Sequence, residues 1–204
     1  MNPVIRYIVR GLYHIWYDFR IEGEENVPRE EGVLIAANHR TYADPVLLTM
    51  PMRRPVKYMA KEELFKNPIF AEFIRELGAF PIRRGAGDMT VINDTVERLK
   101  KGYNVVIFPE GTRQKENKVG RGKTGVALIA GKSGAAVLPM GIVFEGEKLK
   151  FRTKLTLRIG KPIPPEEIAV PEGDRHALNA AKARIMAAIT ELVEGVPEAD
   201  GESE

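Results

Sequence analysis

The sequence predicts an α/β fold: a single-domain sandwich around a largely parallel sheet, with an amphipathic helix at its N-terminus. Three observations carry this prediction. Apolar segments of strand length alternate along the chain with segments of helical periodicity. We find no domain linker or internal repeat between them. The chain has 204 residues, 44% of them hydrophobic and 29% charged, which suits one domain with a sizeable core.

The expected strands are apolar runs of strand length that lie between turn residues. They cover residues 32–37, 55–60, 79–82, 104–108 and 136–144, with one or two more expected within 149–159. Because helical segments separate most of these strands, the sheet should be largely parallel.

The expected helices begin at capping residues or prolines and end before glycines. They cover residues 45–50, 68–77, 88–101, 123–133 and a last helix after Asp174. Asp44 and Pro45 are expected to open the first of these helices, and Asn67 and Pro68 the second. The last helix has an apolar stripe, formed by Leu178, Ala181, Ile185, Ala188, Ile189 and Leu192.

Residues 1–22 are expected to form an amphipathic helix that lies in a membrane interface. Its apolar residues fall within an arc of roughly 140° at about 100° per residue. They are Val4, Ile5, Ile8, Val9, Leu12, Ile15 and Trp16. Arg6 and Arg10 lie on the opposite side, and the segment is rich in aromatic residues, as interfacial helices are. The alternative is a helix that docks on its own domain.

The remaining chain divides into a main domain, residues 23–194, and an acidic tail, residues 195–204, which is expected to be disordered. No stretch reaches the ~18 apolar residues that a membrane-spanning helix needs. The formal charge of +3 favours an anionic partner. We find no nucleic-acid-binding motif beside it, so a nucleic-acid partner is not expected.

The composition excludes several kinds of site. The chain has no cysteine, which excludes disulfides, thiolate metal sites and cysteine nucleophiles. Its two serines, Ser133 and Ser203, do not lie in a Gly-x-Ser-x-Gly motif. His14 and His176 have no partners at metal-ligand spacing, so no metal is expected.

The candidate catalytic pair is His39 and Asp44, which follow the strand expected over residues 32–37. A histidine can act as a base near neutral pH, and a carboxylate on one ring nitrogen fixes its tautomer and stabilises the imidazolium. Because the usual nucleophiles are missing, the pair suggests direct attack by a substrate hydroxyl whose proton the histidine takes. The alternative for Asp44 is a role as a helix cap only.

Two further clusters also follow expected strands. Residues 108–113 read Phe-Pro-Glu-Gly-Thr-Arg. In this segment Gly111 allows a sharp turn, Arg113 offers a planar fork for phosphate or carboxylate, and Glu110 can accept from hydroxyls. The adjacent Arg83 and Arg84 suit an anionic ligand. All of these residues should meet at the carboxyl ends of parallel strands, where ligands bind in open α/β sheets.

Four sequence blocks together resemble the glycerolipid acyltransferase family, in particular the bacterial 1-acyl-sn-glycerol-3-phosphate (lysophosphatidate) acyltransferases. The blocks are Asn-His-Arg-Thr-Tyr-Ala-Asp at 38–44, Gly-Ala-Phe-Pro-Ile-Arg-Arg at 78–84, Phe-Pro-Glu-Gly-Thr-Arg at 108–113 and Val-Leu-Pro-Met-Gly-Ile at 137–142. They occur in the family's order. One departure is Arg83, where members of the family often have an acidic residue, so the resemblance leaves open which of Arg83 and Arg84 faces the ligand.

The resemblance implies an O-acyltransferase of phospholipid biosynthesis. Such an enzyme moves a fatty acyl group from acyl-CoA or an acyl carrier protein thioester to the sn-2 hydroxyl of lysophosphatidate, which gives phosphatidate. Residues 23–194 would then be the acyltransferase domain, with no bound cofactor. The enzyme would be a peripheral protein on the cytoplasmic face of the membrane, and anionic lipid would favour its binding.

The resemblance also implies roles for individual residues, with His39 as general base and Asp44 as its orienting carboxylate. The implied substrate-binding residues are Asn38, Lys61, Arg83, Arg84, Glu110, Gly111, Thr112 and Arg113. Among them, Glu110 and Gly111 would place the glycerol end, and Arg84 and Arg113 would clamp the phosphate. Two alternatives stay open: an acyltransferase for glycerol 3-phosphate or another lysophospholipid, and a non-catalytic basic lipid-binding module.

Overall fold

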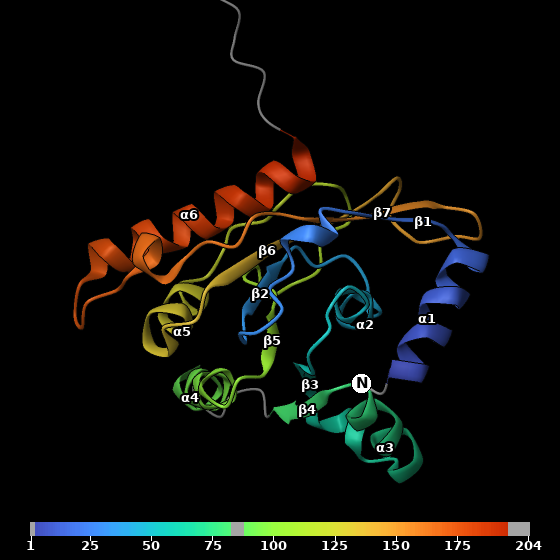
Figure 1. The fold of residues 1–204 in the computed structure, drawn as a ribbon, viewed down its shortest axis with the longest axis horizontal. Coiled ribbons are helices and arrows are strands. Elements are labelled where there is room, and N and C mark those ends of the chain that lie inside the picture. The colour runs from blue at the N-terminus through green and yellow to red at the C-terminus, as the bar shows by residue number, and fades with distance from the viewer. Residues whose placement is uncertain (1–2, 83–87, 196–204) are drawn as a thin grey trace, which may run out of the picture.

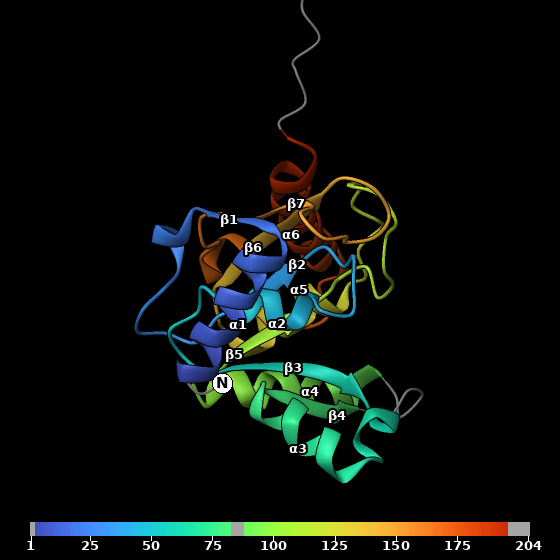
Figure 2. The same cartoon turned by 90° about the vertical axis from the view of Figure 1, so that its right-hand side faces the viewer.

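The computed structural model describes residues 3–82 and 88–195, which form one sheet with helices on both faces (Figure 1 and, turned by 90°, Figure 2). The strands are β1 (Asp18–Glu22), β2 (Leu34–Ala37), β3 (Val56–Lys61), β4 (Ala79–Ile82), β5 (Asn104–Ile107), β6 (Val137–Phe144) and β7 (Lys154–Ile159). The α-helices are α1 (Pro3–Trp16), α2 (Asp44–Thr49), α3 (Pro68–Glu76), α4 (Asp88–Lys100), α5 (Gly125–Ser133) and α6 (Arg175–Glu194).

The sheet has seven strands in the order β1-β7-β6-β2-β5-β3-β4. From β6 to β4 all neighbouring strands are parallel. The antiparallel pairing of β6 with β7 reverses the direction, and β1 then runs parallel to β7. The largely parallel α/β sandwich predicted from the sequence is therefore confirmed.

The N-terminal helix is shorter than the segment of residues 1–22 that we expected. It ends at Trp16, and Asp18–Glu22 forms β1, which pairs with β7 at the edge of the sheet. The local pattern agrees with a strand, because Phe19 and Ile21 point inward while their neighbours are exposed. The prediction extended the helix into this strand, because the strand is defined by its pairing with β7, which is remote in the sequence.

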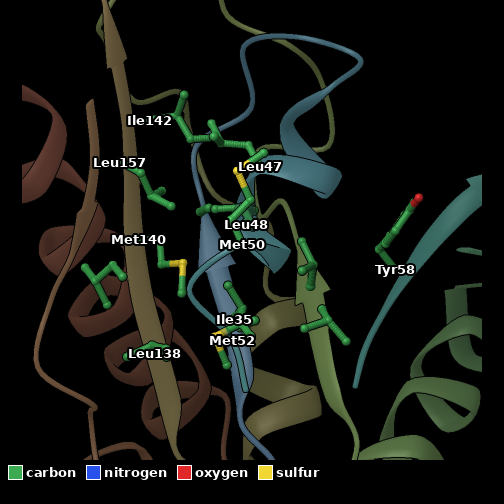
Figure 3. Close-up of a cluster of buried hydrophobic side chains, with 14 of the residues drawn as sticks. Ile35, Leu47, Leu48, Met50, Met52, Tyr58, Leu138, Met140, Ile142 and Leu157 are labelled. Atoms are coloured by element: carbon green, nitrogen blue, oxygen red, sulfur yellow. The ribbon is translucent and has the colours of Figure 1, made fainter. Parts of the chain in front are cut away.

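The sheet separates two hydrophobic clusters, and β2 contributes to both. Ile35 and Ala37 pack against α2 and α3 on one face, while Leu34 and Ala36 pack against α4, α5 and α6 on the other. All four residues are fully buried, which explains why this strand reads as a continuous apolar run. Figure 3 shows the first cluster, in which side chains from the α2 region and from the strands gather above the sheet.

The helix boundaries follow the expected signals with one exception. The Asn67 side chain accepts from the Phe70 N–H at 3.1 Å, and the Asp174 side chain accepts from the Ala177 N–H at 2.9 Å, so both are N-caps. Asp44 was expected to cap α2 but is the first residue of that helix, and its carboxylate turns back toward residues 39–41. The cap role is therefore wrong, and the carboxylate serves the preceding loop instead.

The last helix buries most of its expected stripe. Ala181, Ile185 and Ile189 are buried, together with Val193, while the other members of the stripe are half-buried. None of the helices within the described residues is long and apolar enough to span a bilayer. The tail expected to be disordered lies outside the described residues from position 196 onward.

Candidate functional site

The site lies at the carboxyl ends of two neighbouring central strands, β2 and β5. Their register pairs Ala36 with Ile107, so the loops that follow them begin side by side. The loop after β2 carries the candidate pair, and the loop after β5 carries residues 108–113. This is the sheet edge at which the parallel arrangement predicts ligand binding.

The turn from His39 to Asp44 brings the two side chains into contact. Nδ1 of His39 lies 2.8 Å from Oδ2 of Asp44. The Asp44 side chain is 1% exposed and that of His39 is 20% exposed, so the carboxylate is enclosed while the imidazole reaches the surface. Because a carboxylate can only accept, Nδ1 donates, and Nε2 is the nitrogen left to take a proton.

The Asp44 carboxylate also holds the loop in shape. The backbone N–H groups of Arg40 and Thr41 donate to Oδ2 at 2.5 and 2.7 Å, and the Thr41 hydroxyl donates to Oδ1 at 2.6 Å. These donors stabilise a buried negative charge that would otherwise be costly. The carboxylate thus orients His39 and is itself fixed by the same loop.

The backbone of His39 is held by the loop that follows β5. Its N–H donates to Oε2 of Glu110 at 2.9 Å, and its carbonyl accepts from the Gln114 N–H at 2.8 Å. The Phe108 ring stacks on the imidazole, with 4.0 Å between ring centroids and an angle of 17° between the planes. The imidazole position is therefore set by two segments that are far apart in the sequence.

Glu110 is a buried residue that links two loops, which differs from the role expected for it. Oε2 accepts from His39, and Oε1 accepts from the Gly120 N–H at 2.6 Å. Burial raises the pKa of Glu110 above its ordinary value, while the N–H groups of Gly120 and His39 act in the opposite direction. Both oxygens are engaged inside the protein, so we revise its role from placing glycerol to positioning His39.

Asn38 was expected to bind substrate, and the structure places its side chain elsewhere. It is fully buried, and it exchanges two hydrogen bonds with the backbone of Ile142 on β6. Its Nδ2 donates to the Ile142 carbonyl at 2.9 Å, and its Oδ1 accepts from the Ile142 N–H at 2.7 Å. The amide extends the pairing of β2 with β6 beyond the strand end, so its role is structural.

Arg113 lies on the surface and contacts Tyr42 of the loop that carries His39, residues 38–43, which is the candidate catalytic loop. Its guanidinium carbon is 3.6 Å from the centroid of the Tyr42 ring, and one of its nitrogens donates to the Tyr42 hydroxyl at 3.0 Å. Thr112 is also exposed in this turn. The stacking holds the planar fork of Arg113 beside the catalytic loop, where it can meet an anion.

Gly111 is required by the shape of the turn, because its φ of +71° is strained for other residues. A Cβ atom there would lie 2.9 Å from Nζ of Lys123, which is the end of a flexible side chain and can move aside. Lys123 itself is fixed by a hydrogen bond from its N–H to the Pro109 carbonyl at 2.9 Å. The Lys123 ammonium, which was not predicted from the sequence, therefore lies against this turn as a second cation in addition to Arg113.

Lys61 is the last residue of β3, at the same edge of the sheet, and its side chain is exposed. Within the part of the chain that the structure describes, it makes no hydrogen bond or ion pair with the other site residues. Arg83 and Arg84 lie outside the described residues. The phosphate-binding roles expected for these three residues stay predictions.

Arg40 is a site residue that sequence reasoning missed. Its guanidinium stacks 3.9 Å from the centroid of the Phe144 ring and donates to the carbonyls of Lys115, Gly146 and Phe144 and to Oδ1 of Asn117. Burial lowers the pKa of Arg40, although nearby carboxylates oppose the shift. It ties the catalytic loop to two others, and nothing in the sequence distinguishes this buried arginine from a surface one.

The geometry defines a class of site: a histidine base, oriented by a buried carboxylate, at the carboxyl edge of a parallel sheet. Among the described residues, no cluster of three or more His, Asp or Glu side chains could hold a metal ion. Ser133 lies at the end of α5 and bonds to the Ala130 carbonyl, so it does not serve this histidine. Such a site suits transfer to a hydroxyl of the substrate itself.

Comparisons with known proteins agree with this class. The family model described as Acyltransferase matches residues 18–143, which is more than half of the chain, so the chain belongs to the acyltransferase family. It is 32% identical over 162 residues to the 1-acyl-sn-glycerol-3-phosphate acyltransferase of Bacillus subtilis, and this match covers 78% of the chain and 80% of that protein.

Two further relatives extend the comparison. The chloroplastic 1-acyl-sn-glycerol-3-phosphate acyltransferase LPAT1 of Arabidopsis thaliana is 30% identical over 135 residues, which are 65% of this chain but only 38% of that protein. The crystal structure of the 1-acyl-sn-glycerophosphate (LPA) acyltransferase from Thermotoga maritima superposes with a TM-score of 0.70 at 26% identity, covering 93% of this chain and 77% of that one. The fold of the whole described chain is therefore that of an acyltransferase domain.

Proposed function

We propose that this protein transfers a fatty acyl group from a thioester to the sn-2 hydroxyl of lysophosphatidate and so forms phosphatidate. The observation that carries the proposal is the 2.8 Å contact between His39 Nδ1 and Asp44 Oδ2 at the end of β2. The names of the relatives in Bacillus subtilis, Arabidopsis thaliana and Thermotoga maritima support this acceptor. The donor is acyl-CoA or an acyl carrier protein thioester.

The chemistry needs one base and no enzyme nucleophile. Nε2 of His39 takes the proton of the acceptor hydroxyl while its oxygen attacks the thioester carbonyl carbon. The Asp44 carboxylate stabilises the imidazolium formed in this step. When the carbon–sulfur bond breaks, the imidazolium returns the proton to the leaving thiolate, so the enzyme ends in its starting state.

The acceptor phosphate is proposed to bind at the turn of residues 110–113. Arg113 supplies a planar cationic fork, and Lys123 supplies a second positive charge beside Gly111. Arg84 and Lys61 belong to the same proposal on the strength of the family resemblance. The glycerol backbone would then lie between this turn and His39.

A panel of acceptors tests the proposed function. The purified protein would be incubated with an acyl thioester and with lysophosphatidate, glycerol 3-phosphate, lysophosphatidylcholine or a lysolipid without phosphate. We expect thiol release and a new ester to appear fastest with lysophosphatidate. A preference for glycerol 3-phosphate would assign a different acceptor, and vesicle binding without any ester formation would support the non-catalytic lipid-binding module.

Replacing Arg113 with lysine should raise the KM for lysophosphatidate by about 10- to 100-fold, because hydrogen bonds to charged groups contribute ~1.5–3 kcal/mol. Lysine keeps the charge but loses both the fork and the stacking on Tyr42. The same assays would measure the KM for the thioester and the KM for the phosphate-free acceptor. Both KM values should change little. An equal loss with every acceptor would show that Arg113 only supports the loop.

Membrane contact is the second part of the proposal, and α1 supports it. This helix docks on its own domain through Val9 and Tyr13, which pack against the first core cluster, as does Tyr17 directly after the helix. Its other side remains apolar and exposed, with side chains between 55% (Trp16) and 68% (Ile15) accessible. Tyr7, Ile8 and Leu12 complete this exposed face. A peripheral contact with the cytoplasmic side of a membrane would cover it.

A contribution of Arg6 and Arg10 on α1 to the binding of anionic lipid stays a prediction. Arg10 forms an ion pair with Glu24, with Nη1 and Oε1 3.2 Å apart, so its charge is partly balanced within the protein. The side chains of Val4, Ile5 and Arg6 lie outside the described residues. The apolar face is therefore the main described contribution of α1 to membrane binding.

The variant Ile8→Gln/Leu12→Gln/Ile15→Gln should bind vesicles at least tenfold more weakly, because each change removes apolar area from the interface. Glutamine keeps a good helix propensity, and these side chains do not pack on the core. Deleting residues 1–20 would be a poorer test, because it also removes part of β1. Cosedimentation with vesicles and activity on detergent-dispersed substrate would be measured for this variant and for the wild type. Undiminished vesicle binding by the variant would refute the α1 contact.

A further inference from the structure

The loop between β6 and β7, residues 145–153, is a basic hairpin that the proposed reaction does not use. Its sequence is Glu-Gly-Glu-Lys-Leu-Lys-Phe-Arg-Thr, and β7 then begins with another lysine. One of its two acidic residues, Glu147, lies 3.9 Å from Nζ of Lys115. The three basic residues Lys148, Lys150 and Arg152 therefore leave the hairpin with a net positive charge.

This hairpin carries, near its C-terminal end, an exposed aromatic residue that pairs with another one on α1. Phe151 is 63% exposed, and its ring meets that of Trp16 edge to face, with 5.5 Å between the centroids. The Arg152 N–H donates to the Trp16 carbonyl at 2.8 Å. The hairpin and the C-terminal end of α1 thus contact each other, and Figure 1 shows the two segments side by side at the right.

A polar cavity opens between these two elements. It has a volume of about 350 Å³ and is lined by His14, Tyr17, Asp18, Phe19 and Arg152. Asp18 is the one acidic side chain in this lining, and its carboxylate lies 3.6 Å from Nε of Arg20. Arg152 therefore lines the cavity as a cation. The neighbouring Asp18 already has Arg20 as an ion-pair partner.

The hairpin is also joined to the catalytic loop. Arg40, which follows His39, donates to the Gly146 carbonyl at 2.7 Å and to the Phe144 carbonyl at 3.4 Å. A lipid surface bound by the hairpin would therefore lie next to the loop that carries His39. This position is favourable for an enzyme whose acceptor and product are lipids.

We propose that the hairpin of residues 145–153 is a second membrane-binding surface, specific for anionic phospholipid. Lys148, Lys150 and Arg152 bind headgroup phosphates, while Phe151 and Trp16 lie among the headgroups at the interface. Basic residues close to a bilayer are attracted by anionic lipid, and aromatic residues prefer the interfacial layer. The inference rests on the proposed function, because it presumes a protein that works on lipid. It adds a basic site that adjoins the apolar face of α1 and shares Trp16 with it.

The test removes the three charges without disturbing the hairpin. Lys148 and Lys150 would be changed to glutamine. Arg152 has a φ of +64°, and asparagine tolerates this left-handed conformation better than most residues, so Arg152→Asn suits the backbone. The matched control is Lys100→Gln/Lys101→Gln/Lys132→Gln, at and just after the end of α4 and in α5, at the opposite end of the molecule in Figure 1.

Binding of the full chain to phosphatidylcholine vesicles, with and without phosphatidylglycerol, would be measured by cosedimentation. The hairpin variant should lose affinity for anionic vesicles by on the order of 100-fold at low salt, about fivefold per charge, and much less for neutral vesicles. The control should bind as the wild type does. A Phe151→Ser variant should weaken binding to both kinds of vesicle.

The proposal is overturned if the hairpin variant binds anionic vesicles like the wild type, or if the control loses as much affinity. Activity in detergent micelles should be unchanged in the hairpin variant, and a parallel loss there would assign the hairpin to catalysis instead. If the wild-type protein transfers no acyl group, the proposed function fails. The vesicle comparison still decides whether this surface binds lipid.

Discussion

The His39→Ala variant is expected to lose acyl transfer almost completely, by about 10²–10⁴-fold in kcat or more, while the domain stays folded. His39 is the proposed base for an acceptor hydroxyl, and the buried Glu110 cannot replace it because both of its oxygens are engaged. The fold should survive, because the Asp44 carboxylate keeps its bonds from the Arg40 and Thr41 N–H groups and from the Thr41 hydroxyl.

The measurement is the rate of thiol release from the acyl thioester in the presence of lysophosphatidate, together with circular dichroism and thermal unfolding. Thermal stability should fall only modestly, through loss of the stacking on Phe108. Near-normal turnover by folded His39→Ala protein would eliminate the mechanism. An unfolded variant would be replaced by His39→Gln, which keeps the polar contact with Asp44 but has no basic nitrogen.

The second large effect is expected for Asp44→Asn, with a loss of about 10²–10⁴-fold. An asparagine oxygen can take the place of Oδ2 and accept from His39, Arg40 and Thr41, while its amide donates to the Thr41 hydroxyl. The loop should therefore keep its shape. The neutral amide, however, cannot stabilise the imidazolium that forms as the hydroxyl is deprotonated.

This prediction is checked by comparing kcat and KM of Asp44→Asn with those of Asp44→Ala. The asparagine variant should lose kcat with little change in KM or in melting temperature, whereas alanine leaves the loop donors unpaired and should also lower stability. Full activity of Asp44→Asn would mean that the carboxylate only shapes the loop. The helix-cap alternative is already contradicted, because the carboxylate does not accept from the first turn of α2.

Much of the architecture was predictable because local signals and tertiary packing agree. The continuous apolar run of β2 reports burial on both sheet faces, and the caps at Asn67 and Asp174 act within their own turns. The approach of His39 to Asp44 was predictable for the same reason, since the two residues are only five positions apart in one turn. Edge strand β1 was missed because a strand of five residues gains its identity from a distant partner.

The sequence by itself determined the fold class, the pairing of His39 with Asp44 and the segment that carries Arg113. These features depend on periodicity, turn chemistry and motifs within a few residues. Only the tertiary structure decided how polar groups are used: Asn38 bonds to Ile142, Glu110 holds His39 and Gly120, and Arg40 joins three loops. The physical reason is that a buried polar group must find partners wherever the fold brings them, and those partners lie on strands and loops remote in sequence.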